Sequence, residues 1–424
     1  MTEVVVIGAG VAGIQAALDL ADHDIHVHLI EREPTIGGHM AQLDKTFPTN
    51  DCSMCILSPK MVEVARHPNV TIHTCSEVEG IEGEVGNFRV QVKKHPRYVL
   101  EDECNGCGDC TAICPVEVYN QFDAGIGARK AIYKPHAQAV PDIVVKDQEH
   151  CIECGLCYDV CGKEAILHED KERLLEIEAA SIVVATGYAT FDARNKAQFR
   201  YLIIPDVITS LEFERMINAS GPTGGKLKRL SNGKPPRSVA FVQCVGSRDI
   251  SIGRPYCSGV CCMYAMKNAT LIREKNPDIE VTVFYNDIRA YGKGYEEYYE
   301  RAMSLGVRFV RGFPGEVLEE NDHLTMVAEN TETGEVETFH PDLVVLSVGL
   351  GPAAGADEVA RMLGIPRDES GFFGVADQKV GPVLTVRPGI YVAGTATAPR
   401  DIPDSVAMGE AAAMRAFLDA IRVG

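Results

Sequence analysis

The stretch EVVVIGAGVAGIQAALDLADHDIHVHLIE, residues 3–31, sets the fold class of this chain. It opens with a β-branched run, Glu3–Ile7, which predicts a buried strand, and it passes through a glycine-rich turn into an alanine-rich segment that predicts a helix over 14–21. A second strand is expected over His26–Ile30, directly before the acidic residue Glu31. This order predicts a dinucleotide-binding βαβ unit within an α/β fold.

The three glycines of the turn, Gly8, Gly10 and Gly13, have the G-x-G-x-x-G spacing. They would permit a tight turn, the close approach of a pyrophosphate, and close packing of helix on strand. The Glu31 carboxylate would hold the ribose hydroxyls of the adenosine. A glycine turn without a nucleotide is the less favoured alternative.

Gly37-Gly38, soon after Glu31-Arg32, resembles the second phosphate turn of two-dinucleotide flavoproteins, which favours FAD over NAD as the cofactor. Two later turns resemble turns of the same flavoproteins. An Ala-Thr-Gly turn ends a strand predicted over 179–184, and another turn ends a strand near 389–393. The second turn carries Gly-Thr where Gly-Asp is usual, so Asp401 or Asp404 would be the partner of the ribityl chain. The residues expected to contact FAD in these turns are Arg32, Gly37, Gly38, Thr186, Gly187, Gly394, Thr395 and Asp404.

The chain has 424 residues, enough for two or three domains with buried cores. Its formal net charge is −19, with no block of basic residues, which argues against binding to nucleic acid or anionic membranes. No apolar run is long enough to span a bilayer, and no export signal precedes the first strand, so we expect a cytoplasmic protein. Fifteen cysteines in such a chain favour metal ligation over structural disulfides.

Two cysteine runs lie in a segment of different composition, expected over 98–170 as an inserted domain. Both runs have the spacing C-x2-C-x2-C-x3-C of a bacterial-type ferredoxin, in which the fourth cysteine of each run ligates the other cluster. A pair of zinc sites would be expected to use separated C-x2-C knuckles instead. One predicted [4Fe–4S] cluster takes Cys104, Cys107, Cys110 and Cys161, and the other takes Cys151, Cys154, Cys157 and Cys114.

A further set of cysteines stands where a second nucleotide-binding unit would have its glycine turn. Strands are predicted over 238–242 and 280–285, with a helix from about 262 to 274 between them. No G-x-G-x-x-G is present there, so we expect that thiols have replaced a second dinucleotide site. These thiols belong to Cys244, Cys257, Cys261 and Cys262.

Cys52 and Cys55 form a C-x-x-C pair outside these sets. Such a pair can be a redox disulfide, part of a metal site, or two incidental thiols, and the sequence leaves these alternatives open. With further ligands, the pair would belong to a fourth cluster.

The motifs predict five segments. Residues 1–97, 171–235 and 346–424 are expected to form the FAD-binding domain, with a linker in the second of these. Residues 98–170 form the ferredoxin insert, and 236–345 form a degenerate NAD-binding-like domain that carries the third cysteine set.

Together the motifs resemble the A subunit of heterodisulfide reductase, over essentially the whole chain. The resemblance includes the cysteine sets and the segments 52–57, 60–64 and 401–405. It implies a thioredoxin-reductase-like flavoprotein with an inserted two-cluster ferredoxin, and a third [4Fe–4S] cluster held by Cys244 to Cys262. The long methanogen form also has an N-terminal extension and a second ferredoxin at its C-terminus. We expect what those parts do to be either absent or supplied by partner subunits.

The resemblance implies an oxidoreductase subunit that moves electrons between FAD and [4Fe–4S] clusters without binding NAD(P)H. Lys267, on the predicted helix after Cys262, is a catalytic candidate that would stabilise an anionic reduced flavin; the alternative is a solvated helix lysine. Flavin-based electron bifurcation or confurcation is the favoured function. The alternative is a passive relay in a quinone-interacting or benzoyl-CoA-reductase-type complex, and a stand-alone disulfide oxidoreductase is less favoured.

The expected partners follow from the same resemblance. They are B- and C-type subunits together with a hydrogenase, formate dehydrogenase or NADH-oxidising module. A homodimer is also expected, with membrane contact only through partners.

Overall fold

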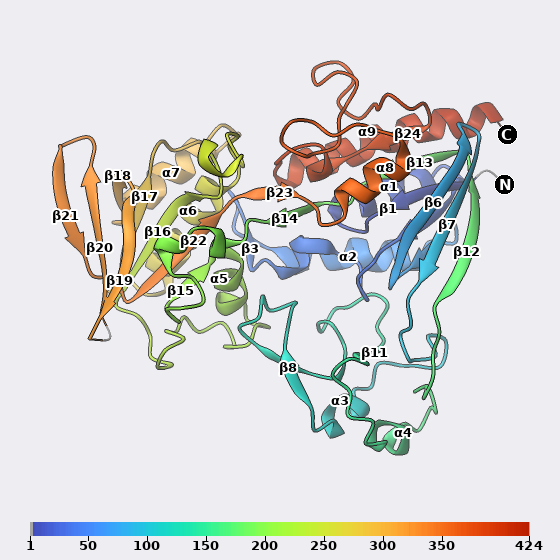
Figure 1. Ribbon diagram of the computed structural model, residues 1–424, viewed down its shortest axis with the longest axis horizontal. Helices are drawn as coiled ribbons and strands as arrows, with labels where there is room; N and C mark the ends of the chain where they lie inside the picture. The colour runs from blue at the N-terminus through green and yellow to red at the C-terminus, as the bar shows by residue number, and fades with distance from the viewer. Residues whose placement is uncertain (1–2, 322, 424) are drawn as a thin grey trace. The chain divides into compact units, whose positions relative to one another are not determined.

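The computed structural model describes residues 3–321 and 323–423. The chain forms two compact units, which Figure 1 shows with their elements labelled. Each unit has its own sheet and its own hydrophobic core. Unit 1 comprises residues 1–41, 54–188 and 352–424, and unit 2 comprises residues 42–53 and 189–351.

Five parallel strands form the central sheet of unit 1. They are β1 (Glu3–Ile7), β2 (His26–Ile30), β5 (Val70–His73), β13 (Ser181–Val184) and β24 (Ile390–Val392). Their order, β24-β13-β1-β2-β5, places β1 in the middle. Val4, Val5 and Val6 are fully buried because both faces of the sheet are covered. The strands predicted in 3–31 are confirmed.

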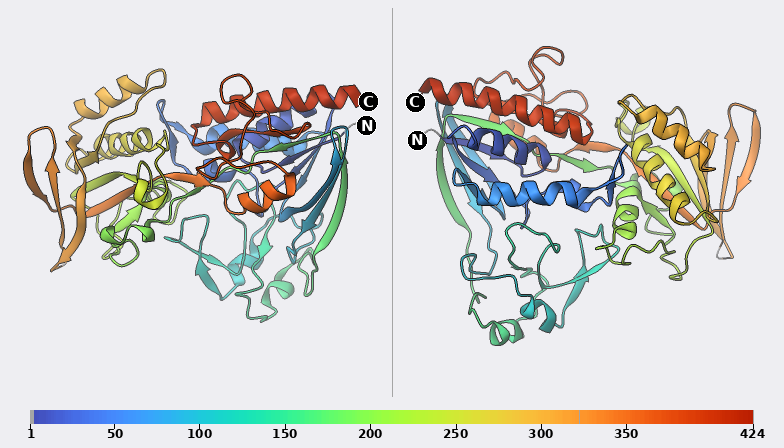
Figure 2. Two further views of the ribbon diagram at one scale, coloured as in Figure 1. Left: turned by 45° about the horizontal axis from the view of Figure 1, so that its top comes forward. Right: turned by 180° about the vertical axis from the view of Figure 1, so that it is seen from behind.

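Helices α1 (Val11–Ala21) and α9 (Ile402–Val423) lie side by side on one face of this sheet (Figure 2). Small residues allow the close approach: a Cβ on Gly409 would lie 2.5 Å from the Ala12 carbonyl oxygen. The helix predicted over 14–21 is confirmed as α1, which begins three residues earlier than expected. Helix α2 (Ser53–Arg66) adds Leu57 and Met61 to the same core.

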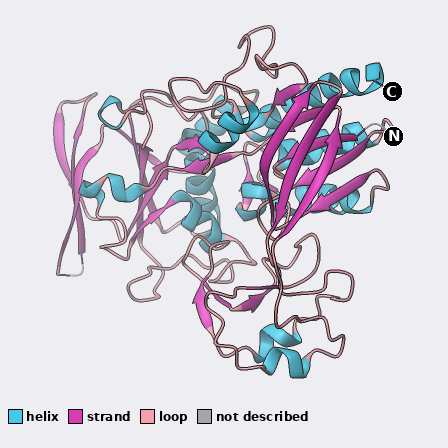
Figure 3. Ribbon diagram, turned by 45° about the vertical axis from the view of Figure 1, so that its right-hand side comes forward, coloured by secondary structure: helices cyan, strands magenta, loops and turns pink. Residues whose placement is uncertain are grey.

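A three-stranded antiparallel sheet packs on the other face (Figure 3). Its strands are β6 (Ser76–Glu84), β7 (Asn87–Lys94) and β12 (Arg173–Ala179), and helix α8 (Ala356–Leu363) contributes to the same core. Lys94 of β7 lies directly opposite Arg173 of β12. The intervening residues, 95–172, therefore leave this sheet and return to it at one place.

The segment between β7 and β12 is mostly loop with short elements (Figure 3). Two hairpin-like pairs and two one-turn helices hold it together around a core of its own. The elements are α3 (Asp109–Ile113), β8 (Glu117–Tyr119), β9 (Ala128–Lys130), β10 (Ile132–Tyr133), β11 (Val145–Lys146) and α4 (Leu156–Val160).

Unit 2 is built on a second parallel sheet, whose strand order is β15-β22-β16-β17-β18. These strands are β15 (Val207–Thr209), β16 (Ser238–Val245), β17 (Glu280–Tyr285), β18 (Arg308–Arg311) and β22 (Leu343–Val348). The helices are α5 (Ser210–Ile217), α6 (Cys261–Lys275) and α7 (Tyr295–Ser304). The strand–helix–strand predicted between 238 and 285 is confirmed.

An antiparallel sheet of β19 (Pro314–Glu320), β20 (His323–Asn330) and β21 (Glu335–Phe339) completes unit 2. Short strands β3 (Lys45–Thr46) and β4 (Asp51–Cys52) pair with each other, as do β14 (Tyr188–Thr190) and β23 (Leu350–Pro352). Among the described residues, no helix combines the length and apolarity needed to cross a membrane.

Candidate flavin and iron-sulfur sites

The glycine turn lies between the carboxyl end of β1 and the first turn of α1. Gly8 has φ 99°, and a Cβ there would lie 2.4 Å from the Ala185 carbonyl oxygen. A Cβ on Gly13 would lie 1.9 Å from the Gly8 carbonyl oxygen. Around Gly10, at the N-cap of α1, nothing lies within 4 Å of that position. Two of the glycines therefore allow close packing, and the third leaves the helix N-terminus open to an anion.

The Glu31 side chain is buried beside this turn. Its Oε2 accepts a hydrogen bond from the Ala9 amide at 2.8 Å, and its Oε1 accepts one from the Glu33 amide at 3.0 Å. Burial raises the pKa of this carboxyl above its ordinary value. Arg32 is more than half exposed and donates to the Ala354 carbonyl oxygen at 3.2 Å. The structure places Glu31 at the turn, and its contact with a ribose stays a prediction.

Gly37 and Gly38 form a second turn, which lies against the glycine turn of residues 8–13. The Gly37 amide donates to the Ala9 carbonyl oxygen at 2.8 Å, and a Cβ on Gly38 would lie 3.0 Å from the Gly10 Cα. Thr186, after β13, has a buried hydroxyl oxygen without a hydrogen-bond partner in the described part of the chain. Buried hydroxyls are normally hydrogen-bonded, so a bound polar ligand fits this position.

The turn that contains Gly394, directly after β24, lies against α1. Gly394 has φ 62°, and a Cβ there would lie 3.0 Å from the Ala12 Cβ. Asp401 accepts a hydrogen bond from the Asp404 amide at 2.9 Å and so caps α9. The Asp404 side chain is exposed; partial burial, followed by the charge of Asp401, raises the pKa of its carboxyl. These three turns and the glycine turn therefore come together in unit 1, and this arrangement fits FAD.

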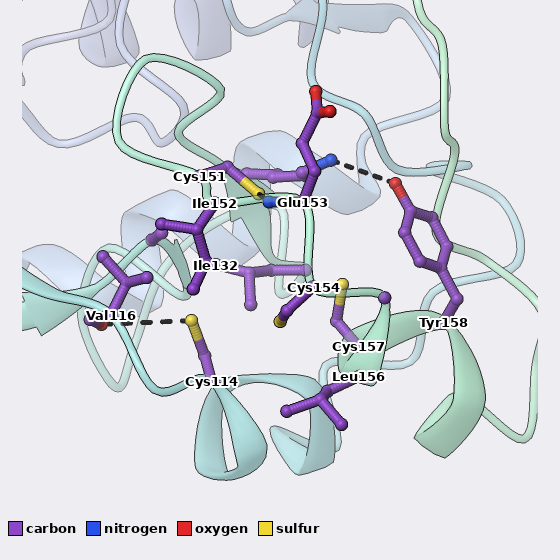
Figure 4. Close-up of a pocket in the computed structure, with 13 residues that line it drawn as sticks. Cys114, Val116, Ile132, Cys151, Ile152, Glu153, Cys154, Leu156, Cys157 and Tyr158 are labelled. Atoms are coloured by element: carbon purple, nitrogen blue, oxygen red, sulfur yellow. Dashed lines mark hydrogen bonds between the residues drawn. The ribbon is translucent and has the colours of Figure 1, made fainter.

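A pocket in the insert is lined by the cysteines assigned to one cluster (Figure 4). Cys151, Cys154 and Cys157 come from the second run, and Cys114 comes from the end of the first run. About 380 Å³ in this pocket is filled by no protein atom, part of it open to solvent. The structure thus brings together three consecutive ligands of one run and the last cysteine of the other.

The backbone around both runs is shaped in the same way. Gly108 and Gly155 are the N-caps of α3 and α4 and have φ 88° and 83°, a left-handed conformation that favours glycine. Amides also point at sulfur: Glu153 N lies 3.4 Å from Cys151 Sγ, and Ala165 N lies 3.4 Å from Cys161 Sγ. Such N–H groups stabilise cluster sulfurs, so the cradle fits the predicted group.

The other quartet of the insert has the same pattern of exposure, with one buried, one exposed and two partly buried cysteines in each quartet. Cys110 is buried, while Cys107 is exposed. Burial, with smaller contributions from the Cys104 and Cys107 thiols, raises the pKa of Cys110 to about 11. Cys161 packs against the same small core as Cys110. Among the described residues, no group of three His, Cys, Asp or Glu side chains is arranged to bind a single metal ion. A cubane does not require such a group, because its four thiolates bind four different iron atoms.

The third quartet lies at the carboxyl end of β16 and the start of α6. Cys244 has φ 58° beside an irregularity in the β16–β22 pairing, and Cys261 and Cys262 are buried in the first turn of α6. The pKa of Cys244 is raised to about 11. Burial is the main cause, and the nearby thiols of Cys262 and Cys257 contribute to the same shift. The four thiols therefore lie close together where a nucleotide-binding unit would have its phosphate turn.

Two basic residues beside the thiols were not predicted. Lys146 lines the pocket of the insert, and Arg248 interacts with the Cys244 and Cys257 thiols while it pairs with the Asp287 carboxylate at 2.5 and 3.1 Å. A single Lys or Arg near a cysteine run has no sequence pattern that marks it as a neighbour of the cluster.

Lys267 is 1% exposed, so the alternative of a solvated helix lysine is wrong. Its ammonium is paired with the Glu214 carboxylate of α5 and donates to the Lys45 carbonyl oxygen at 3.0 Å. These contacts all lie within unit 2, and a role toward a flavin stays a prediction. Cys52 and Cys55 are disulfide-bonded, and the other thirteen cysteines are free.

Two known families match parts of the chain. Residues 103–166 match a 4Fe-4S dicluster domain, and residues 2–122 match the pyridine nucleotide-disulphide oxidoreductases. The first match contains both cysteine runs of the insert, and the second contains the glycine turn. The matches imply iron–sulfur clusters and FAD as cofactors.

Solved structures with a similar fold include two thioredoxin reductases. The T. acidophilum enzyme has a TM-score of 0.55 at 15% identity, covering 99% of this chain and 100% of its own. The Lactococcus lactis enzyme has a TM-score of 0.55 at 18% identity and is matched over 100% of both chains. This likeness confirms the predicted thioredoxin-reductase-like fold.

Relatives of much higher identity come from methanogens. The A subunit of the H(2):CoB-CoM heterodisulfide,ferredoxin reductase of Methanothermobacter marburgensis is 51% identical over 419 residues, covering 98% of this chain and 64% of that protein. The A-type iron-sulfur subunit 2 of the CoB--CoM heterodisulfide reductase of Methanopyrus kandleri is 55% identical over 414 residues, covering 97% of this chain and 63% of its own. The chain spans somewhat less than two thirds of these relatives' length. About half of its residues are identical to theirs along nearly its whole length, and the chain belongs to the family of heterodisulfide reductase A subunits.

Proposed function

We propose that this chain is an oxidoreductase subunit that holds one FAD and three [4Fe–4S] clusters and transfers electrons between them. The observation that carries the proposal is the pocket where Cys114 joins Cys151, Cys154 and Cys157. The spacing of the two runs, with the fourth cysteine of one run joining three cysteines of the other, is that of a bacterial-type [4Fe–4S] ferredoxin. The arrangement of four thiols in place of a phosphate turn in unit 2 supports the third cluster.

Unit 1 would hold FAD through its four glycine-containing turns. Bound FAD would convert two-electron chemistry into one-electron transfer to clusters. The open N-terminus of α1 at Gly10 would receive the pyrophosphate. The Thr186 hydroxyl, which has no partner among the described residues, would hydrogen-bond to the cofactor. Because Asp401 caps α9, Asp404 is the acid we propose as the ribityl partner.

Because a thiol site occupies the position of a phosphate turn in unit 2, we propose that electrons enter or leave this chain singly and not as hydride from NAD(P)H. The relatives are named CoB-CoM heterodisulfide reductases, and several names also contain ferredoxin. By this relationship, the partners would be the other subunits of such a complex and a module that oxidises hydrogen, formate or NADH. The favoured overall reaction is flavin-based electron bifurcation or confurcation.

The composition of the purified protein tests the cofactor assignment. We expect roughly 12 iron atoms and one FAD per chain after anaerobic purification. In Cys154→Ser and in Cys244→Ser, the iron content should fall by about four in each case, because each substitution removes a ligand of a different cluster. A wild-type content of about eight, unchanged in Cys244→Ser, would contradict the third cluster. About 16 would assign a fourth cluster to Cys52 and Cys55.

The two one-electron potentials of the flavin separate bifurcation from a passive relay. If the second electron is removed at a lower potential than the first, we conclude bifurcation; well-separated potentials in the ordinary order support a relay. We propose that Lys267 acts on reduced flavin only when its pairing with Glu214 opens. A Lys267→Met protein with the wild-type flavin potential would contradict that role.

A further inference from the structure

The pocket that holds Cys114, Cys151, Cys154 and Cys157 also contains the Lys146 side chain. Lys146 ends strand β11 and is 4% exposed. Its Nζ hydrogen-bonds to the Tyr158 hydroxyl oxygen at 3.0 Å, one of the contacts drawn in Figure 4. The ammonium also lies 5.2 Å from the ring centre of Tyr98 and 5.4 Å from that of Tyr158.

Several contacts hold this side chain in place. The Tyr158 hydroxyl donates to the Leu167 carbonyl oxygen at 3.0 Å, and the Tyr158 ring stacks on His168 with 3.6 Å between ring centres. Lys146 itself lies opposite Ile132 in the β10–β11 pair. The ammonium is therefore held by an anchored phenol and two aromatic faces.

The positive charge of Lys146 is not compensated by a carboxylate. Three other basic side chains of the insert form ion pairs: Arg129 with Asp147, Lys130 with Glu117, and Lys134 with Asp142. In the described part of the chain, Lys146 has no such partner. Its ammonium acts on the Cys151 and Cys157 thiols, so its charge is directed toward the thiols of this pocket.

At the position that matches Lys146, the other quartet of the insert has an uncharged residue. Lys146 stands five residues before Cys151, and Val99, also 4% exposed, stands five residues before Cys104. Lys163 follows Cys161 closely, but its side chain is exposed, where water screens the charge. The two halves of the insert thus repeat the ligand spacing and differ in buried charge.

We propose that Lys146 gives the cluster held by Cys151, Cys154, Cys157 and Cys114 the higher reduction potential of the two clusters in the insert. Reduction adds one electron to a group that is already anionic, and neither forms nor breaks a bond. A buried cation beside the group stabilises the added charge, and local net charge is one of the factors that set such potentials. In turnover the electron would come from the flavin or from a one-electron donor protein. This inference depends on the cluster assignment proposed above.

The test is a redox titration of the anaerobically purified, cluster-loaded full chain, followed by electron paramagnetic resonance. The reduction step that is lost or altered in Cys154→Ser belongs to the cluster that Cys154 helps to bind. In Lys146→Met, which keeps the length of the side chain, we expect that step to become at least tenfold less favourable, a downward shift of about 59 mV for one electron. The other steps should stay in place.

Lys171→Met is the matched control, because it removes the same formal charge from an exposed side chain of unit 1. It should leave every step unchanged. An unshifted step in Lys146→Met with full iron content would overturn the inference, and so would an equal shift of all steps. If Lys146→Met loses iron, Lys146→Gln, which keeps a donor for Tyr158, replaces it. A wild-type iron content that does not fall in Cys154→Ser would instead contradict the cluster assignment itself.

Discussion

At the scale of single residues, the three glycines of the first turn serve different purposes. The space around each missing side chain distinguishes them. Gly13 allows α1 to pack on β1, since a Cβ there would overlap the Gly8 carbonyl oxygen. Gly10 has open space instead, as a site for an approaching pyrophosphate requires.

Alanine substitutions should separate these purposes. Gly10→Ala should leave the unfolding midpoint unchanged but lower FAD affinity at least about tenfold, because the methyl group would occupy the space of the phosphate. Gly13→Ala should destabilise unit 1 by about 1–3 kcal/mol through overpacking. FAD content and denaturant unfolding measure both effects. Wild-type FAD affinity in Gly10→Ala would contradict the placement of the pyrophosphate.

At the scale of elements, two histidines join neighbouring strands of the parallel sheet of unit 1. His28 of β2 and His73 of β5 face each other with 3.0 Å between Nδ1 and Nε2, and His28 also contacts Glu3 of β1 at 3.0 Å. Burial, with a smaller contribution from the charge of His28, lowers the pKa of His73 to about 4. The folded sheet therefore favours the neutral imidazole.

This shift predicts a pH dependence of stability. Below about pH 6.5 the unfolded chain binds a proton at residue 73 that the folded chain does not bind, so stability falls as the pH drops from about 6.5 toward 4. At about pH 5.5 the loss from His73 is on the order of 1 kcal/mol relative to neutral pH. Urea unfolding of His73→Gln should show a smaller loss over this range than the wild-type protein does. His340→Gln, at an exposed position, should behave like wild type.

At the scale of the whole molecule, the insert is attached to the rest of unit 1 by buried polar contacts as well as by the β7–β12 pair. Arg97 is 1% exposed. Its guanidinium donates to the Pro34 carbonyl oxygen at 2.7 Å, to the Thr74 hydroxyl oxygen at 2.8 Å, and to the Val144 carbonyl oxygen at 3.3 Å. One side chain thereby joins the insert to the segment that follows β2 and to the end of β5.

Replacing this side chain should loosen the insert. Arg97→Met leaves buried oxygens without donors, and we expect a destabilisation of about 2–4 kcal/mol and faster chymotrypsin cleavage within 98–170. Arg89→Met, which breaks an exposed pair with Glu176, should cost less than about 1 kcal/mol and leave cleavage unchanged. Equal cleavage of the two variants would show that the insert is held by its strands alone.

Features that depend on short spacing could be read from the amino-acid sequence alone. Strand–glycine–helix–strand–acid order, and cysteines separated by two or three residues, are imposed by the geometry of a phosphate turn and of a cluster cradle. The βαβ stretch 3–31, the ferredoxin-like runs and the family could therefore be recognised from local patterns. The strands and helix around Cys244 followed in the same way from apolar periodicity.

Contacts between side chains far apart in sequence could not be read in this way. The Glu214 partner of Lys267, the three acceptors around Arg97, and the position of Lys146 in a cysteine pocket depend on how elements pack. A single basic residue carries no periodic or spacing signal, and its burial cannot be read from its neighbours in sequence. Its charge acquires a role only when packing excludes water and brings a partner within a few ångströms.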